Sequence, residues 1–480
     1  MKSDIKWIPL LIITAISVGL WQLAPPEGLS VPAWHTVIIF VATIAAIVCK
    51  VGEIGLLGIV SMTVYALTYA AGAKNDAGAI KDALSQLSSS LIWLVVVAFM
   101  IARGFIKTGL GRRIALLMIR AFGKKTLGLA YGLAFADLIL APAMPSNTAR
   151  CGGVIYPIAD SLSRNFESYP ENESRSKVGT FLVSCIGNMN DITSALFLTA
   201  YTGNLLVAKL ATDLGYDFSW GSWLLAMLLP CVISFIVIPL VIYFVTKPEI
   251  KNTPDAPALA VKQLAEMGKV KAGEWVMIFT VVVLLILWIF GQQLGVNATT
   301  TAFVGLSILL LSGVLSWDDI KNEKGAWDTL IWFAALLMMA TQLQTLGFTK
   351  WFGELMGQEI GAFLGDTNWI ILLVVINAAY FYLHYFFASG NAQIAALYSV
   401  LLGVGLSLNV PLAPLALSMA ASSSLSCSLT QYTHARGPIL FGAGYVPTGV
   451  WWKTGFIVSV VNQIILFGVG LIWWKMLGLY

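Results

Sequence analysis

Three adjacent residues, Ser146, Asn147 and Thr148, place two hydroxyls and an amide in the middle of an otherwise apolar stretch. The apolar segments on either side, 127–143 and 152–159, are each too short to cross a bilayer comfortably. Together they predict a hairpin that enters the membrane and turns back. Irregular polar backbone is tolerated at membrane depth only where it is buried in protein or lines a solvated cavity. A transport site is therefore the first hypothesis for this segment.

The composition excludes a soluble protein and argues against an enzyme. Of the 480 residues, 58% are hydrophobic and 11% are charged, whereas about 25% of the residues in soluble proteins are charged. The mean hydropathy is +0.83. The chain has no HExxH zinc motif, nucleophile elbow or Walker A loop, and its loops are too short to hold a catalytic domain. The sequence therefore predicts a polytopic membrane protein that is not an enzyme.

The hydropathy pattern predicts an all-α protein with eleven membrane crossings, read in windows of about 19 residues. Two further segments, 127–159 and 370–404, are expected to be re-entrant hairpins that enter from opposite sides, because each has a polar kink at its centre. The crossings are expected at 7–23, 34–49, 51–70, 91–106, 178–210, 223–245, 274–290, 299–315, 327–345, 414–440 and 450–476.

The distribution of Lys and Arg predicts the orientation. If the N-terminus is cytoplasmic, most Lys and Arg residues fall in cytoplasmic loops, and the opposite loops 24–33 and 291–298 contain none. The exceptions are Lys74, Lys81, Lys209 and Lys350. By the positive-inside rule, we expect a multi-pass protein of the cell inner membrane, with its N-terminus in the cytoplasm and its C-terminus outside.

The chain divides into two similar halves, residues 1–245 and 274–480, separated by a polar cytoplasmic linker at 246–273. Each half has an apolar run that begins with Ile-Trp, then a hairpin, and then a long helix interrupted by polar residues, at 178–210 and 414–440. The number of crossings between corresponding elements is odd, so the copies should be inverted. Inverted repeats with discontinuous helices that meet near the midplane are typical of secondary transporters.

Four irregular segments fall where the two halves should meet: Ser146-Asn147-Thr148, Thr199 to Asn204, Ser389-Gly390-Asn391, and Thr430 to Gly437. Each break exposes amides at one helix end, which attract carboxylates, and carbonyls at the other, which suit a sodium ion. A single segment of this kind is often only a packing kink, because Gly, Ser and Thr are common contact residues in transmembrane helices. Four in corresponding positions favour a binding site.

Several motifs in these segments resemble those of the divalent anion:sodium symporter family, especially its citrate, tartrate and oxoglutarate/malate exchanger branch. They are GLGRRIAL at 109–116, LILAPAMPSNTARCGGVIYPI at 138–158 and GAGYV at 442–446. The resemblance covers nearly the whole chain. It implies a homodimeric elevator-type carrier of di- or tricarboxylates: succinate, malate, fumarate, oxoglutarate, tartrate or citrate. The expected partners are these small carboxylates and membrane lipid, with no nucleic acid.

The resemblance also implies which residues bind. The expected substrate-binding residues are Ser146, Asn147, Thr148, Tyr201, Thr202, Ser389, Asn391, Thr433, His434 and Arg436. No cofactor is expected apart from possible sodium ions, whose ligands would be at Ser146, Asn147, Ala200, Ser389 and Asn391.

The chain departs from the family pattern in three places. The second signature reads Ser389-Gly390-Asn391, the fifth-span break ends in Gly203-Asn204 instead of Pro-Asn, and the tenth-span break has His434-Ala435-Arg436 where Thr-Gly-Pro is common. These departures weaken the case for a second sodium site. They favour exchange of one carboxylate for another, with sodium symport as the alternative and an anion channel as a weaker one.

Arg436 and His434 each have two interpretations. A buried Arg436 would be a strong carboxylate partner, and its charge could take the place of a bound sodium, left unpaired when the carrier is empty. Alternatively, it extends to the cytoplasmic interface as an anchor. His434 either donates a hydrogen bond to the substrate or packs between helices.

The remaining polar residues within the spans carry weaker signals. Asp137, Asn188, Asn190 and Asp191 are expected to bond neighbouring backbone, with Asp191 as a less favoured proton or cation site. His35 and His384 are expected to be structural.

Overall fold

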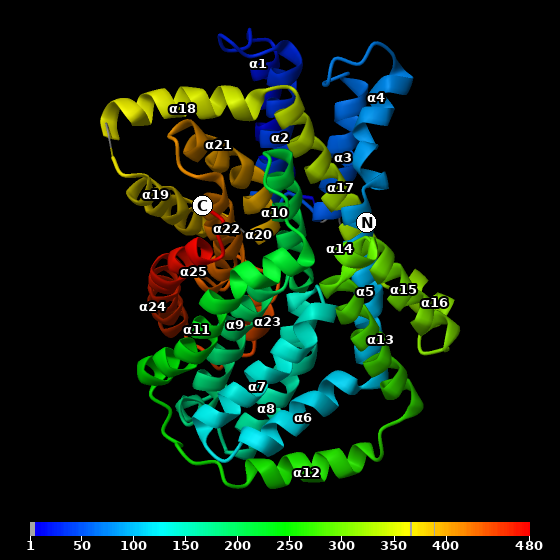
Figure 1. Ribbon diagram of the computed structural model, residues 1–480, viewed down its shortest axis with the longest axis vertical. Coiled ribbons are helices and arrows are strands. Elements are labelled where there is room, and N and C mark those ends of the chain that lie inside the picture. The colour runs from blue at the N-terminus through cyan, green and yellow to red at the C-terminus, as the bar shows by residue number, and fades with distance from the viewer. Residues whose placement is uncertain (1–4, 365–366, 388) are drawn as a thin grey trace.

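The computed structural model describes residues 5–364, 367–387 and 389–480, and all of its regular elements are helices. The prediction of an all-α protein is confirmed. Most helices run along the long axis of the molecule, while α12 and α18 lie across it at opposite ends (Figure 1). Residues 1–4, 365–366 and 388, which belong to the predicted halves, lie outside the described residues.

Helices lie at all eleven predicted crossing positions. In the first half these are α1 (Trp7–Trp21), α2 (Val31–Val48), α3 (Ile54–Leu67), α5 (Ser90–Thr108), the pair α9 (Gly179–Leu196) and α10 (Thr202–Asp213), and α11 (Trp220–Thr246). In the second half they are α13 (Ala272–Ile289), α15 (Ala298–Leu311), α17 (Lys324–Thr345), the pair α22 (Leu412–Leu425) and α23 (Gly437–Gly442), and α24 (Thr448–Ile465) continued by η9 (Leu466–Gly470) and α25 (Leu471–Met476).

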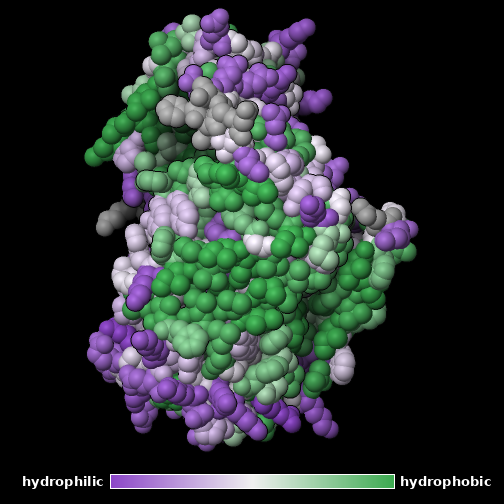
Figure 2. Space-filling model, turned by 60° about the vertical axis from the view of Figure 1, so that its left-hand side comes forward, coloured by the Kyte–Doolittle hydropathy of each residue, from purple (hydrophilic) through white to green (hydrophobic). Residues whose placement is uncertain are grey.

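The described residues include nine helical segments that are long and apolar enough to cross a membrane. Three of these, 126–143, 369–386 and 390–407, are arms of the predicted hairpins. Apolar side chains form a broad band over one face of the molecule, with hydrophilic side chains above and below it (Figure 2). This distribution fits a protein surrounded by lipid at its middle.

The two hairpins share an order of helix types, except for one additional short helix, α20, in the second. The first runs through α7 (Thr126–Leu140), a 3₁₀ turn (Ala141–Ala143), the tip, a π-helical segment (Ala149–Ile155) and α8 (Tyr156–Asn165). The second runs through α19 (Trp369–Tyr382), a 3₁₀ turn (Leu383–Phe386), the tip, α20 (Gly390–Gln393), a π-helical segment (Ile394–Tyr398) and α21 (Ser399–Ser407). Ala388, at the second tip, lies outside the described residues.

Six further helices have no counterpart in the predicted spans. They are α4 (Asp76–Ala83), α6 (Leu110–Phe122), α12 (Ala256–Met267), α14 (Gly291–Leu294), α16 (Trp317–Lys321) and α18 (Phe348–Leu364). The predicted linker therefore contains a helix, α12. Between α5 and α6 the chain turns at Gly109, whose φ of +77° favours glycine. The buried Arg113 of α6 donates from Nε to Glu274 Oε1 of α13 at 2.5 Å.

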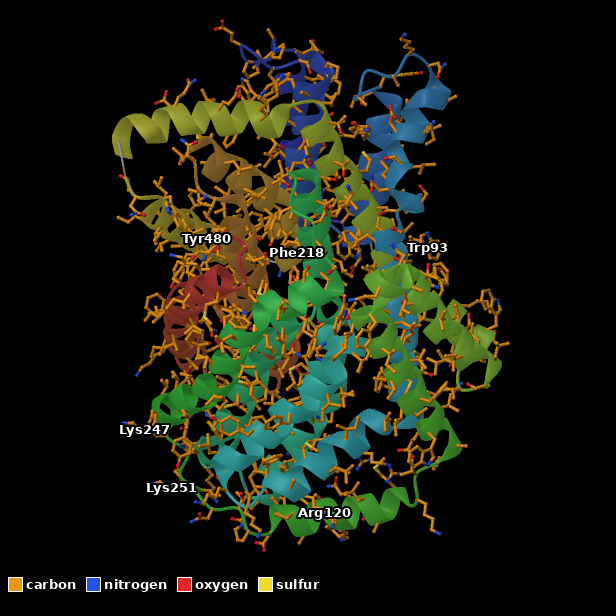
Figure 3. The ribbon with its side chains drawn as sticks, viewed as in Figure 1. Trp93, Arg120, Phe218, Lys247, Lys251 and Tyr480 are labelled. Atoms are coloured by element: carbon orange, nitrogen blue, oxygen red, sulfur yellow. The ribbon has the colours of Figure 1, made fainter. Side chains whose placement is uncertain are left out.

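Corresponding helices of the two halves lie at opposite ends. The helix after α5 is α6, near the end where α12 lies, and the helix after α17 is α18, at the other end (Figure 1). Arg120, Lys247 and Lys251 lie at the α12 end (Figure 3). This end carries the loops that the charge distribution assigns to the cytoplasm.

Two interrupted helices, α9 and α22, form the centre of the molecule. All residues of α9 are buried, as are all residues of α22 after the first. The two helices pack against each other. Neither has a lipid-facing side, so their many polar side chains must find partners inside the protein.

Candidate functional site

The four predicted irregular segments meet at one cavity of about 270 Å³. Their lining residues are Pro145, Ser146, Asn147, Thr148, Tyr201, Thr202, Ser389, Gly390, Asn391, His434 and Ala435. The opposite wall consists of Phe99 from α5 and Gly325, Asp328, Thr329 and Trp332 from α17. The cavity therefore lies between the breaks and two uninterrupted helices.

Eight of the ten expected substrate-binding residues line this cavity, and Thr433 and Arg436 do not. Thr433 is buried, and its hydroxyl donates to the Thr430 carbonyl at 3.2 Å. The sequence reasoning missed the wall on α5 and α17. Nothing in the hydropathy of these helices distinguishes the side that faces the breaks.

The serine at each hairpin tip caps the helix that follows it. Ser146 Oγ accepts a hydrogen bond from the Ala149 amide at 3.1 Å, and Ser389 Oγ accepts one from the Ala392 amide at 3.4 Å. These caps fix the start of two helical arms, 149–165 and 390–407. A helix N-terminus carries roughly half a positive charge. Both tips therefore bring positive potential and free amides to the cavity.

Tyr201 explains why the second signature contains glycine. A Cβ atom on Gly390 would lie 2.5 Å from the Tyr201 hydroxyl oxygen and 3.7 Å from its Cζ. The Tyr201 ring cannot easily move away, because it is buried and lies directly against Gly203. No larger side chain fits at position 390 while the tyrosine hydroxyl occupies that space.

The first break, between α9 and α10, is held by side chains that satisfy freed carbonyls. Phe197 and Tyr201 have extended backbone, so the last carbonyls of α9 have no helical partners. Asn204 Nδ2 donates to the Ser194 and Phe197 carbonyls at 2.7 and 3.0 Å. Trp223 Nε1 donates to the Ala195 carbonyl at 3.0 Å. Asn204, which the family's Pro-Asn ending also contains, therefore supplies the group that closes the break.

His434, in the second break, connects this break to the first hairpin tip. Its Nδ1 accepts from the Arg436 amide at 3.2 Å, so a neutral imidazole carries its proton on Nε2. Nε2 lies 3.0 Å from Nδ2 of Asn147, and two N–H groups cannot bond each other. The amide of Asn147 must therefore be turned, so that its oxygen accepts from Nε2 and its NH₂ group faces away from His434, free for a ligand. His434 therefore orients a donor at the first tip.

Arg150, three residues beyond Asn147, is a residue that the sequence reasoning missed. It is fully buried, and its Nε donates to Asp137 Oδ1 at 2.9 Å. Nη1 donates to the carbonyls of Met144 at 2.6 Å and Ala200 at 3.0 Å. One guanidinium thus joins the hairpin arm, the hairpin tip and the first break. An arginine within a membrane segment is expected to have such partners, and that rule could have identified it.

Arg436 forms the second buried ion pair. Nη2 lies 2.5 Å from Asp191 Oδ1, and Nη1 donates to Asn190 Oδ1 at 3.0 Å. Asn190 in turn donates to both oxygens of Asp137 at 3.0 and 3.1 Å. The two pairs form one network of two positive and two negative charges across both halves of the chain.

Three expectations for these residues are wrong. Arg436 is 3% exposed, so it is not an interfacial anchor, and its charge is already paired by Asp191 without any substrate. Asp137 and Asp191 bind arginine side chains, and the Asn190 side chain bonds Asp137 and Arg436, so none of the three side chains bonds neighbouring backbone. Asn188 does bond backbone, donating to the Ser184 carbonyl at 2.8 Å. The two histidines expected to be structural have protein partners: His384 bonds Gln393, and His35 stacks on Trp21.

Two of the oxygens expected to bind sodium differ in their partners. The carbonyl of Ala200 accepts a hydrogen bond from Arg150, which leaves its second lone pair. At the second tip, Asn391 Oδ1 is buried without a hydrogen-bond partner.

The chain is similar to known proteins over nearly its whole length. The family described as "Sodium:sulfate symporter transmembrane region" matches residues 4–480. The "Putative malate transporter YflS" of Bacillus subtilis (strain 168) is 48% identical over 480 residues, covering 100% of this chain and 98% of that protein. "Dicarboxylate transporter 2, chloroplastic" of Spinacia oleracea is 41% identical, covering 100% of this chain and 84% of that protein.

Among solved structures, the YdaH transporter of Alcanivorax borkumensis has a similar fold. The TM-score is 0.56 at 13% sequence identity, with 94% of this chain and 99% of that chain covered. At this identity the likeness concerns the fold alone.

The Arg150 ion pair yields a stability prediction. Arg150→Met leaves Asp137 as a buried carboxylate without its cation, and breaking a buried pair in this way costs about 3–5 kcal/mol. We expect a clearly lower midpoint of thermal unfolding in detergent. Arg164→Gln is the control, because Arg164 forms an exposed pair with Asp160 that is worth little. Equal unfolding midpoints for the two variants would contradict the structural role of Arg150.

The contact between Tyr201 and Gly390 yields a second prediction. Gly390→Ala should destabilise the protein by about 1–3 kcal/mol, because its Cβ overlaps the tyrosine hydroxyl. Tyr201→Phe removes that oxygen and leaves the nearest ring carbon at 3.7 Å. The double variant should therefore recover most of the lost unfolding midpoint. If the two effects simply add, the proposed contact is incorrect.

Proposed function

This chain belongs to the sodium:sulfate symporter family, whose members are transporters and not enzymes, and we propose that it exchanges dicarboxylates across the membrane. The observation that carries the proposal is the cavity at which both hairpin tips and both helix breaks meet. The names of the relatives, a malate transporter and a dicarboxylate transporter, support this substrate class. Candidate substrates are succinate, malate, fumarate and oxoglutarate, together with tartrate and citrate.

In the proposed complex, each carboxylate of the substrate binds at one hairpin tip. The amides at the start of the arms 149–165 and 390–407 provide positive potential from two directions. At the first tip, the Asn147 NH₂ group that His434 orients is available as a donor. At the second tip, Asn391 Nδ2 donates to Thr202 Oγ1 at 3.2 Å. Two anchoring points of this kind suit a molecule with a carboxylate at each end.

We further propose an elevator movement. The breaks and hairpins form one side of the cavity and α5 and α17 form the other, so movement between these groups would carry the bound substrate. The matching helix types of the two hairpins and the positions of α6 and α18 at opposite ends support an inverted repeat. We also propose that the protein forms a homodimer in the inner membrane. Its N-terminus would be cytoplasmic and its C-terminus external.

Exchange is favoured over sodium coupling by the contacts at the first tip. The Ala200 carbonyl, an expected sodium ligand, accepts a hydrogen bond from Arg150, which competes with a sodium ion for that oxygen. Sodium symport is the second candidate, favoured by the unpartnered Asn391 oxygen at the second tip.

Proteoliposomes test the coupling directly. We expect vesicles preloaded with an unlabelled dicarboxylate to take up labelled dicarboxylate much faster than empty vesicles under an inward sodium gradient. Replacing sodium by choline should leave exchange unchanged. Strong concentrative uptake into empty vesicles driven by sodium alone would overturn exchange and support the symporter. Uptake without any acceleration by internal substrate would indicate a channel.

Substitution at the second tip tests the location of the site. Asn391→Ala should remove a hydrogen bond to a charged group, worth about 1.5–3 kcal/mol, so the Kd for a dicarboxylate should rise by about tenfold or more. Asn322→Ala, an exposed change beyond the end of α16, is the control. Titration calorimetry of the purified proteins measures both. Binding by the Asn391 variant with the affinity of the unaltered protein would place the substrate elsewhere.

A further inference from the structure

Asp328 of α17 is an acidic residue in a cavity that is proposed to bind anions. It lines the wall opposite the two hairpin tips. Its side chain is exposed, and no Lys, Arg or His among the described residues lies within ion-pair distance of it. A carboxylate at this position repels a bound anion. Asp328 therefore does not strengthen anion binding and must have another role.

The carboxylate of Asp328 lies beside α3, where a Cβ on Gly55 would be 2.3 Å from Oδ1. Gly55 is the second residue of α3, and the free amides at a helix N-terminus stabilise a negative charge. Glu53, just before α3, interacts electrostatically with Asp328 and adds to the negative potential. Lys324, one turn earlier on α17, is exposed and makes no ion pair with it.

The rest of the cavity offers no compensation for an additional anionic group. Its described lining residues include no Lys or Arg, and the two buried arginines of the neighbouring network are paired with aspartates. Positive potential comes only from the two hairpin tips. A ligand with two carboxylates can use both tips, whereas a third carboxylate must point away from them, toward the wall that carries Asp328.

We propose that Asp328 determines specificity by excluding tricarboxylates such as citrate while admitting dicarboxylates. This inference rests on the proposed function and narrows its substrate class. Repulsion is strongest on the third carboxylate, because the first two are held at the tips, farther from Asp328. Asp328 is thus a specificity-determining residue that does not need to touch a dicarboxylate.

The test compares citrate with a dicarboxylate as inhibitors of exchange in proteoliposomes. The labelled substrate is whichever of succinate, malate, fumarate and oxoglutarate exchanges fastest. In Asp328→Asn, the half-inhibitory concentration of citrate should fall by about fivefold or more at a pH where citrate is fully ionised, because a like-charge repulsion is lost. The value for the unlabelled dicarboxylate should change less than about twofold. Asp318→Asn, an exposed change on α16 outside the cavity, should alter neither value.

Two further variants and a pH series complete the test. Asp328→Glu keeps the charge and should still discriminate between citrate and the dicarboxylate. Asp328→Ser, which should behave like Asp328→Asn, replaces that variant if it is poorly expressed. Lowering the pH removes one charge from citrate and should improve its inhibition of the unaltered protein more than that of Asp328→Asn.

The outcomes separate this inference from the proposed function. If the unaltered protein exchanges no dicarboxylate, the proposed function fails. If it exchanges dicarboxylates but already accepts citrate equally well, or if the ratio of the two inhibition values is the same in Asp328→Asn and Asp318→Asn, the role of Asp328 is overturned while the transporter remains.

Discussion

Where a membrane helix is interrupted, its freed backbone amides and carbonyls must find hydrogen-bond partners inside the protein. The rest of the structure depends on the side chains that provide these partners. Arg150 binds the carbonyls of Met144 and Ala200 while it pairs with Asp137. Arg436 joins the second break to α9 through the side chains of Asn190 and Asp191. In hydrocarbon, each unmade hydrogen bond costs several kcal/mol, and each unpaired charge costs more. These two ion pairs help the breaks to persist at membrane depth.

The pairing of the buried charges has consequences for the proposed ligand. Because these charges cancel, the cavity would attract anions mainly through the helix N-termini that Ser146 and Ser389 cap. Such potential is directional and is strongest at the two tips. It would therefore select for the spacing of carboxylates as well as for charge. The wall on α17, which carries Asp328 and no cation, is the part of the cavity where additional negative charge is least favourable.

Much of the fold could be predicted from the sequence, because lipid imposes strong rules on length and polarity. Both hairpin tips and both breaks follow from polar residues within apolar runs. The helices α6, α12 and α18 were missed because they are amphipathic or polar and do not cross. The pairing of Arg436 with Asp191 and the wall around Asp328 join residues far apart in the chain. No hydropathy pattern contains that information, although the rule that intramembrane charges pair could have directed attention to Arg150.

The central claim is that a dicarboxylate binds between the two hairpin tips. The most direct measurement is an electron cryo-microscopy structure of the purified transporter in lipid nanodiscs with the dicarboxylate it exchanges fastest. We expect density for the ligand in the cavity, with one carboxylate at Ser146-Asn147-Thr148 and the other at Ser389-Gly390-Asn391. Ligand density at any other place, with this cavity unchanged from the ligand-free state, would contradict the account.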